Sequence, residues 1–337
     1  MTCMDDHIRD HGGNIDMAMA RYGGTASDWI DLSTGINRVP YPIPALPPEA
    51  WTTLPTRAAQ AVLLQAARAA YRTNASMLAV AGAQAAIQML PRLGQPGRAR
   101  VLTPTYNEHA AGLRAAGWTV DEVGSLAALE GADLAVVVNP NNPDGQSHAP
   151  TTIMQLAGKV GRLVVDESFA DPVPSLSIAP MAGQAQMFVL RSFGKFYGLA
   201  GVRLGFVLGA PSEIAKLAEM AGPWPVAGPA LVVGTLALSD RQWAAATMAR
   251  LASETREIDV IAATAGWKLV GGTALFRLYD TPDARAAQEK LARARIWSRV
   301  FPKPLPQSGR WLRLGLPGTP TEWNRLARAL EGQRHGV

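Results

Sequence analysis

Apolar residues recur along the chain in two patterns, as short continuous runs and as longer stretches with helical spacing. Short runs, which are typical of buried strands, lie at residues 77–81, 100–103, 134–138, 163–165, 188–190 and 203–208. Stretches that favour helices lie between them, at residues 58–71, 83–90, 108–116, 151–160 and from 212 onward. Strands that alternate with helices in this way indicate βαβ units, and therefore a mostly parallel sheet with helices on both faces.

The pattern changes after about residue 222. Helices are predicted at 241–265, 284–294 and 321–330, and strands at 273–278, 297–301 and 311–314. This arrangement favours a smaller α+β domain with a few antiparallel strands. The first 55 residues are rich in Pro and Gly and predict an irregular arm. We therefore expect an arm over 1–55, a large domain over 56–230 and a small C-terminal domain over 231–337.

Composition narrows the class of protein. Hydrophobic residues make up 48% and charged residues 18% of the chain, which argues against intrinsic disorder. The net charge of +5 comes from dispersed basic residues, so we expect anionic small-molecule ligands rather than nucleic acid. The single cysteine, Cys3, excludes an internal disulfide and a cysteine-based zinc site, and no metal is expected.

Two observations concern location. The most apolar stretch, residues 226–238, spans 13 residues and contains a proline and two glycines, which is too short for a membrane span. The N-terminus has neither a basic segment nor an apolar core of the signal-peptide type. We expect a cytoplasmic protein without membrane association.

Candidate chemistry lies where the predicted strands end. The segments 139–145, 166–169 and 192–195 each follow a strand, and Arg203 comes eight residues after Lys195. Each feature alone has an ordinary explanation as a turn, a cap or a solvated charge. In an open α/β sheet, however, ligands bind beyond the carboxyl ends of the strands. A carboxylate, an amide, a lysine, an arginine and a serine at one edge would suit an electron-poor aromatic ring that carries a phosphate and an aldehyde.

In order and spacing, these residues resemble the fold type I pyridoxal-phosphate enzymes, the aspartate-aminotransferase superfamily, over most of the chain. Within that superfamily, four stretches resemble the threonine-phosphate decarboxylases of cobalamin biosynthesis. These stretches are His11-Gly12-Gly13-Asn14-Ile15, Asp31-Leu32-Ser33-Thr34-Gly35-Ile36-Asn37, Leu190-Arg191-Ser192-Phe193-Gly194-Lys195-Phe196-Tyr197 and Pro223-Trp224.

The resemblance implies pyridoxal 5'-phosphate as cofactor and assigns residues to it. Lys195 would bind the cofactor aldehyde covalently and later transfer protons. Asp166 would pair with the ring nitrogen, Asn142 would bind the ring hydroxyl oxygen, and Tyr106 would stack on the ring. The cofactor phosphate would be bound by the backbone N–H groups of Ala83 and Gln84 at a helix start and by the side chains of Ser192 and Arg203.

The resemblance also implies substrate contacts. Arg313 matches the arginine that binds the substrate α-carboxylate across the superfamily, because a guanidinium binds a carboxylate bidentately. Arg299 is the candidate for the phosphate of the substrate. The N-terminal arm would fold over the active site, where His11 and Asn37 would add further contacts. A homodimer is expected because sites of this fold type usually form at a dimer interface.

Two positions depart from related aminotransferases. Phe169 stands where a tyrosine usually binds the ring oxygen, and this departure favours the decarboxylase branch. Leu54-Pro55 stands where relatives place a Tyr-Pro that reaches the cofactor phosphate of the partner subunit. One phosphate contact is therefore expected to be missing.

The predicted activity is decarboxylation of L-threonine O-3-phosphate to (R)-1-aminopropan-2-ol O-phosphate. A histidinol-phosphate-type aminotransferase is the alternative, since it shares every cofactor residue. A catalytically silent pyridoxal-phosphate-binding regulator is a further alternative, and the absence of a basic DNA-binding segment argues against it.

Overall fold

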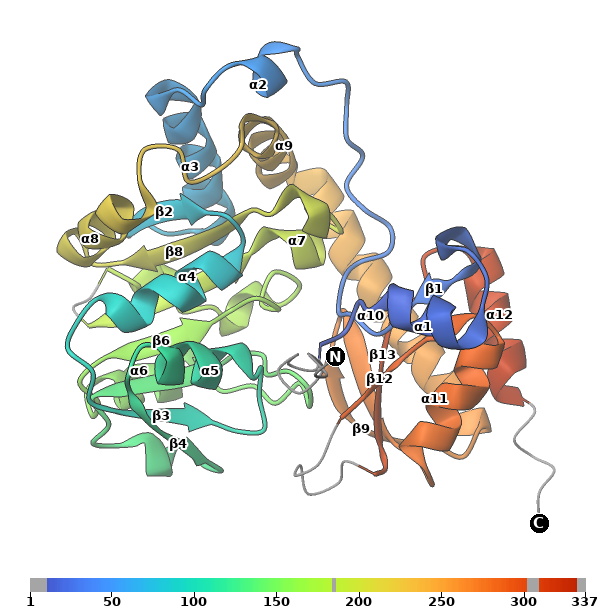
Figure 1. Cartoon of the computed structure of the whole chain (residues 1–337). Coiled ribbons are helices and arrows are strands. Elements are labelled where there is room, and N and C mark those ends of the chain that lie inside the picture. Colours follow the sequence, from blue (N-terminus) through green and yellow to red (C-terminus); the bar gives the residue numbers. More distant parts are fainter. Residues whose placement is uncertain (1–10, 184–185, 302–308, 332–337) are drawn as a thin grey trace, which may run out of the picture. The chain divides into compact units, whose positions relative to one another are not determined.

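A seven-stranded sheet forms the centre of the larger of two structural units in the computed structural model, which describes residues 11–183, 186–301 and 309–331. Its strand order is β2-β8-β7-β6-β5-β3-β4. The strands are β2 (Ser76–Val80), β3 (Arg98–Leu102), β4 (Thr119–Val123), β5 (Leu134–Val138), β6 (Leu163–Asp166), β7 (Met187–Ser192) and β8 (Gly205–Gly209). Neighbouring strands from β4 to β7 are parallel, whereas β8 is antiparallel to β2 and β7 (Figure 1). The expected α/β fold with a mostly parallel sheet is confirmed.

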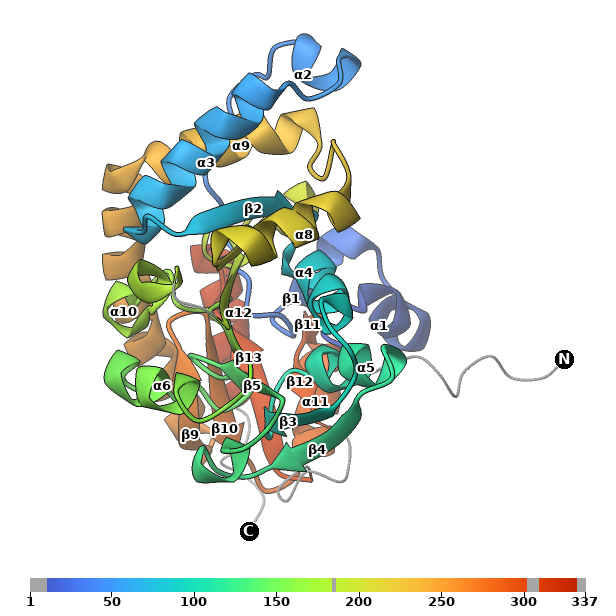
Figure 2. The same ribbon diagram turned by 90° about the vertical axis from the view of Figure 1, so that its left-hand side faces the viewer.

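Helices cover both faces of this sheet. The helices within the larger unit are α2 (Glu49–Thr52), α3 (Arg57–Tyr71), α4 (Ala83–Met89), α5 (Glu108–Ala115), α6 (Pro150–Ala157), α7 (Phe193–Phe196), α8 (Pro211–Ala221) and α9 (Gly228–Ser239). Figure 2 shows α6 on the opposite side of the sheet from α4 and α5. Strand β5 is buried along its whole length, which explains its uninterrupted apolar sequence.

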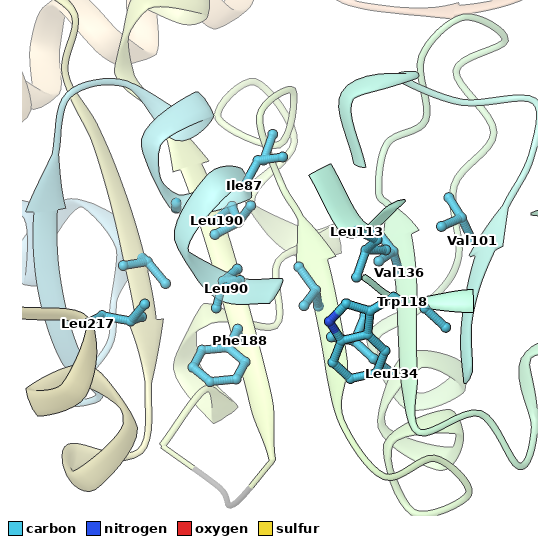
Figure 3. Close-up of a cluster of buried hydrophobic side chains, with 14 of the residues drawn as sticks. Ile87, Leu90, Val101, Leu113, Trp118, Leu134, Val136, Phe188, Leu190 and Leu217 are labelled. Atoms are coloured by element: carbon cyan, nitrogen blue, oxygen red, sulfur yellow. The ribbon is translucent and has the colours of Figure 1, made fainter. Parts of the chain in front are cut away.

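The main core lies between the sheet and helices α4, α5 and α8. Ile87 and Leu113 come from α4 and α5, Leu217 from α8, and Phe188 and Leu190 from β7 (Figure 3). All five side chains are at least 96% buried. Because these helices are held against the strands, the helix starts that follow β2 and β3 are fixed at the edge where the site residues lie.

A four-stranded antiparallel sheet forms the centre of the smaller unit, in the order β12-β13-β10-β9. The helices and strands of the smaller unit are α1 (Ile15–Tyr22), β1 (Ile30–Asp31), β9 (Lys268–Thr273), β10 (Phe276–Asp280), α11 (Ala284–Arg293), β11 (Ile296–Trp297), β12 (Arg299–Val300), β13 (Trp311–Gly315) and α12 (Pro320–Glu331). Strand β1 pairs with β11 in parallel. Trp29 and Trp297 pack edge to face with ring centroids 6.3 Å apart. The N-terminal segment is therefore built into this unit.

The units differ in extent from the predicted domains. The larger unit is formed by residues 40–251, and the smaller by the described residues of 1–39 and 252–337. The sequence-based boundaries lay near residues 55 and 230. Helix α10 (Arg241–Thr264) continues across the border between the units.

Two local predictions were wrong. The strand predicted at 273–278 is a hairpin, in which β9 ends at Thr273 and β10 begins at Phe276. Leu275 is buried in the turn between them, so the apolar run continues where the chain reverses direction. The arm is also more regular than predicted, because α1 forms there and Asn14 caps it by accepting a hydrogen bond from the N–H of Met17.

Candidate active site

Asp166 is a buried carboxylate at the end of β6, with 3% of its surface exposed. One oxygen, Oδ2, lies 2.8 Å from Nε2 of His109, and Oδ1 accepts the backbone N–H of Ser168 at 2.9 Å. Burial raises the pKa of Asp166, but the hydrogen bonds from His109 and Ser168 outweigh it, and the net pKa lies below the ordinary value. The residue predicted to pair with a cationic ring nitrogen is therefore held in its ionised form.

His109 was missed by the sequence analysis. It lies in the first turn of α5, is 3% exposed, and packs edge to face against Tyr106 with centroids 6.2 Å apart. A single histidine in a helix is no signal by itself. The available clue was its position. It lies in the segment that follows β3, at the same edge of the sheet as Asp166.

Tyr106 and Gln84, both predicted to bind the cofactor, are brought together by the structure. The hydroxyl of Tyr106 donates to Oε1 of Gln84 at 3.3 Å, and Nε2 of Gln84 donates to Oε2 of Glu108 at 2.9 Å. This chain of hydrogen bonds connects the start of α4 with the start of α5. It fixes the orientation of the Tyr106 ring beside the edge that carries Asp166.

Other segments of the chain lie very close to the start of α4. A β-carbon at Gly205 would lie 2.5 Å from the backbone nitrogen of Ala83, and one at Gly82 would lie 2.8 Å from Nη2 of Arg203. Ser192 pairs in register with Gly205. The predicted phosphate contacts at Ala83, Ser192 and Arg203 therefore converge, and a helix start with free N–H groups suits an anion.

Arg203 lies just before β8 rather than inside the strand predicted for 203–208. Its backbone has a φ of 54°, in the left-handed region, and the residue is exposed. This conformation ends the short helical turn formed by residues 200–202. The guanidinium is thereby placed against Gly82, where a β-carbon would displace it and where the φ of 73° strains any other residue.

Asn142 lies in the loop that follows β5, and its neighbours fix that loop. Oδ1 of Asn141 accepts the hydroxyl of Thr105 at 2.6 Å, and Nδ2 of Asn141 donates to the carbonyl of Pro104 at 2.8 Å. Nδ2 of Asn139 donates to the carbonyl of His148. The asparagine run is therefore partly structural, because it ties the loop after β5 to the loop after β3. Asn142 itself is half-buried.

Lys195 lies on the short helix α7 that follows β7. Its Nζ is 5.5 Å from the ring centroid of Phe169, which is 96% buried. Gly194 is required beside it, because a β-carbon there would lie 2.7 Å from Cα of Ala200. The Lys195 side chain is therefore half-buried beside an aromatic ring.

A buried ion-pair network lies directly behind these residues. Arg191, next to Ser192, donates to Glu167 at 2.8 Å and to Asp171 at 2.6 Å. Glu167, next to Asp166, also accepts the hydroxyl of Ser177 at 2.5 Å. The end of β7 and the segment after β6 are thus tied together by charge-assisted hydrogen bonds.

Arg313 and Arg299, the predicted substrate contacts, lie in the smaller unit as a register pair on β13 and β12. Arg313 is 6% exposed, and its Nη2 donates to the carbonyl of Ser33 at 2.7 Å. Burial, followed by the charge of Arg299, lowers the pKa of Arg313 below the ordinary arginine value, against an opposing effect of Asp31. Two neighbouring guanidinium groups of this kind favour binding of an anion.

His11 and Asn37 also belong to the smaller unit. His11 is exposed and precedes Gly12, where a β-carbon would lie 2.4 Å from the carbonyl oxygen of Ser33. Asn37 is buried, and its Oδ1 accepts the N–H of Val39 at 3.1 Å. Ser33 thus lies beside the segment of His11 and also accepts from Arg313, whereas Asn37 has a structural hydrogen bond. The substrate roles of these residues remain predictions.

Among the described residues, no three histidine, cysteine, aspartate or glutamate side chains could together hold a metal ion. Over the same ranges, no helix is long and apolar enough to cross a membrane.

Sequence comparison agrees with this geometry. The model of the family described as aminotransferase class I and II matches residues 46–330, which includes every predicted cofactor contact. The chain belongs to this family. A threonine-phosphate decarboxylase of Pseudomonas aeruginosa is 42% identical over 330 residues, covering 96% of this chain and 97% of the relative. A threonine-phosphate decarboxylase of a Sinorhizobium species is 43% identical over 328 residues, covering 95% and 97%.

A solved structure shares the fold. The histidinol-phosphate aminotransferase of Sinorhizobium meliloti, determined in complex with pyridoxal 5'-phosphate, superposes with a TM-score of 0.79 at 19% identity. The match covers 99% of this chain and 97% of that structure. The predicted fold class and the predicted family are therefore both confirmed.

Proposed function

We propose that this protein is a pyridoxal-phosphate-dependent decarboxylase of L-threonine O-3-phosphate that forms (R)-1-aminopropan-2-ol O-phosphate for cobalamin biosynthesis. The observation that carries the proposal is the similarity to two threonine-phosphate decarboxylases over almost the whole chain. The site geometry agrees with it. We also propose that the protein acts in the cytoplasm and does not bind nucleic acid.

The residues present fit the cofactor. The ionised Asp166 suits a protonated ring nitrogen, and the Ala83 N–H, Ser192 and Arg203 suit a phosphate, in a space kept open by Gly82 and Gly205. When bound, pyridoxal phosphate supplies an electron sink for the carbon that loses CO₂.

The side chains of this protein bind and orient the cofactor and transfer the proton. Asp166, held by His109, keeps a proton on the ring nitrogen. Tyr106 and Asn142 would orient the ring, and Lys195 would hold the cofactor and donate a proton at the reacting carbon. Orientation decides which bond at this carbon breaks.

The arginine pair suits the two anionic groups of the substrate. Arg313 binds the α-carboxylate and Arg299 the substrate phosphate, with His11 and Asn37 as further contacts. A carboxylate held tightly by Arg313 would be stabilised in the ground state. We therefore propose that Arg313 would hold the carboxylate in an orientation that favours loss of CO₂.

We also propose a homodimer. On the larger unit, Trp51 and Leu54 are 68% and 64% exposed, and Trp224 is 54% exposed. Helices α2 and α9 contact each other, and Gly228 at the start of α9 lies against the backbone of Ala50. Large exposed apolar side chains on this part of the surface favour an interface, and a second copy of the chain is the partner that the fold type predicts.

The test compares two reactions of the holoenzyme. With threonine phosphate alone, the cofactor should return to its aldehyde form after each turnover, and with glutamate its absorbance should not change. Conversion of the cofactor to its amine form by glutamate, with keto-acid formation from histidinol phosphate and 2-oxoglutarate, would instead identify the aminotransferase.

A further inference from the structure

A cavity of 370 Å³ lies within the larger unit, behind the residues assigned to the cofactor. Its lining includes the buried side chains of Tyr71, Asp171 and Arg191, which we call the floor. Phe196 and Tyr197, the two residues that follow Lys195, also line it. None of the twelve residues predicted to bind cofactor or substrate lines it. Its volume is in the range of small-molecule sites.

Buried polar atoms without partners gather at this floor. Within the part of the chain that the structure describes, Oδ2 of Asp171, Nε of Arg191 and the hydroxyl of Tyr71 have no hydrogen-bond partner. The three side chains are at least 93% buried. Such atoms are usually satisfied in folded proteins, so three of them around one cavity indicate a ligand with polar groups.

The charges define which groups would fit at the floor. Arg191 already binds Asp171 through Nη2 at 2.6 Å and Glu167 through Nη1 at 2.8 Å. Two carboxylates therefore surround one guanidinium, which leaves an excess of negative charge. The second oxygen of Asp171 accepts a hydrogen bond when ionised, whereas Nε of Arg191 can only donate one. The floor therefore favours a hydroxyl group, which can donate to the first and accept from the second.

The exposed part of the lining carries positive charge. Arg72 and Arg241 line the cavity, and both are exposed. Over the described residues, neither guanidinium forms an ion pair with a carboxylate. Leu238, Ala244 and Met248 provide an apolar wall, which suits a short carbon chain. Two arginines of this kind favour a phosphate.

We propose that this cavity is a second small-molecule site, which takes a short phosphorylated molecule that also carries a hydroxyl group. The hydroxyl group binds Asp171, and the phosphate binds Arg72 and Arg241. Since Arg191 precedes Ser192 and Phe196 follows Lys195 along the chain, a ligand bound here contacts the segments that carry the cofactor residues. The proposal of this second site holds whichever reaction the enzyme catalyses.

Calorimetric titration of the holoenzyme with sn-glycerol 3-phosphate tests the proposal. This probe has hydroxyl groups and a phosphate but no amine, so it cannot compete covalently with Lys195. We expect saturable binding of one molecule per chain. The double variant Arg72→Gln/Arg241→Gln should weaken it at least 10-fold, and Ala244→Phe, which fills the cavity without changing charge, should abolish it.

Two controls locate the binding. The double variant Arg57→Gln/Arg256→Gln removes the same charge from exposed positions of α3 and α10 outside the cavity lining and should bind as the wild type does. Arg313→Gln should also leave binding unchanged. The absence of binding, an equal loss in the control pair, or a loss that follows Arg313→Gln would each overturn the proposal.

Discussion

At the scale of single residues, Asp166 shows how contacts from distant segments set the charge state of a candidate site residue. The carboxylate would be costly to bury as an ion, yet two hydrogen bonds favour that form. The sequence predicted Asp166 because it directly follows a buried strand. It could not predict His109, whose partner lies 57 residues away, because only the folded sheet brings the two together.

Replacing His109 with Phe removes one of these hydrogen bonds. The folded-state pKa of Asp166 lies below its unfolded value of 3.8, so its ionised form stabilises the fold above that pH, and the effect is lost as the pH falls through the folded-state pKa. We expect the variant to lose about 1–3 kcal/mol of unfolding free energy near neutral pH. Urea unfolding should show a smaller loss at about pH 3.

His109→Gln is the matched control, because its amide can still donate to Asp166. It should retain part of the stability near neutral pH and part of the cofactor affinity. If His109→Phe lost the same free energy at both pH values, the hydrogen bond to an ionised Asp166 would not be the cause.

Arg313 is expected to serve binding more than stability. It is buried next to Arg299, so Arg313→Met removes a charge that burial disfavours, in a side chain of similar length. Thermal unfolding should change little, within about 1 kcal/mol, whereas kcat/KM for threonine phosphate should fall at least 100-fold, about 2.7 kcal/mol. A large loss of stability with unchanged kcat/KM would refute the substrate role.

At the scale of elements, the site depends on how closely strands and helix starts approach. The pattern of apolar runs predicted β5, β6 and β7 well, because both faces of these strands are buried and their residues are apolar up to the polar ends of β6 and β7. It missed α9, in which apolar residues lie on all sides and no helical periodicity is visible. It also missed β4, none of whose residues is fully buried.

Gly205→Ala tests the close approach of β8 to α4. The new methyl group would lie 2.5 Å from the backbone nitrogen of Ala83, so that N–H must move away from the proposed phosphate position. We expect cofactor affinity, measured by fluorescence titration of the apoenzyme, to fall at least 10-fold, about 1.4 kcal/mol. Gly201→Ala, which meets nothing within 4 Å, should bind normally, and equal affinities in the two variants would contradict this account.

At the scale of the whole molecule, the sequence predicted the class of fold but could not place the N-terminal segment. Pairing of β1 with β11 joins it to the C-terminal part of the chain. Such pairing between segments more than 260 residues apart leaves no periodic signal in either one, and the short β1 is only two residues long. The motif His11-Gly12-Gly13 nevertheless marked the segment as important, and it packs against Ser33.

Oligomeric state can be tested through the exposed tryptophans. Trp51→Ser combined with Trp224→Ser removes apolar surface from the proposed interface and should raise the dimer dissociation constant at least 10-fold in analytical ultracentrifugation. Val260→Ser, at a residue that is 67% exposed in the other unit, should leave the dimer unchanged. A wild-type protein that sediments as a monomer at micromolar concentration would refute the dimer.

The most direct test of the central claim is the stoichiometry of CO₂ release. Holoenzyme is incubated with L-threonine O-3-phosphate labelled with ¹³C in the carboxyl group, and phosphorus NMR follows the product while CO₂ is collected. We predict one labelled CO₂ for each aminopropanol phosphate formed, and neither product from Lys195→Ala. Consumption of threonine phosphate without labelled CO₂, or unchanged release by Lys195→Ala, would contradict the account.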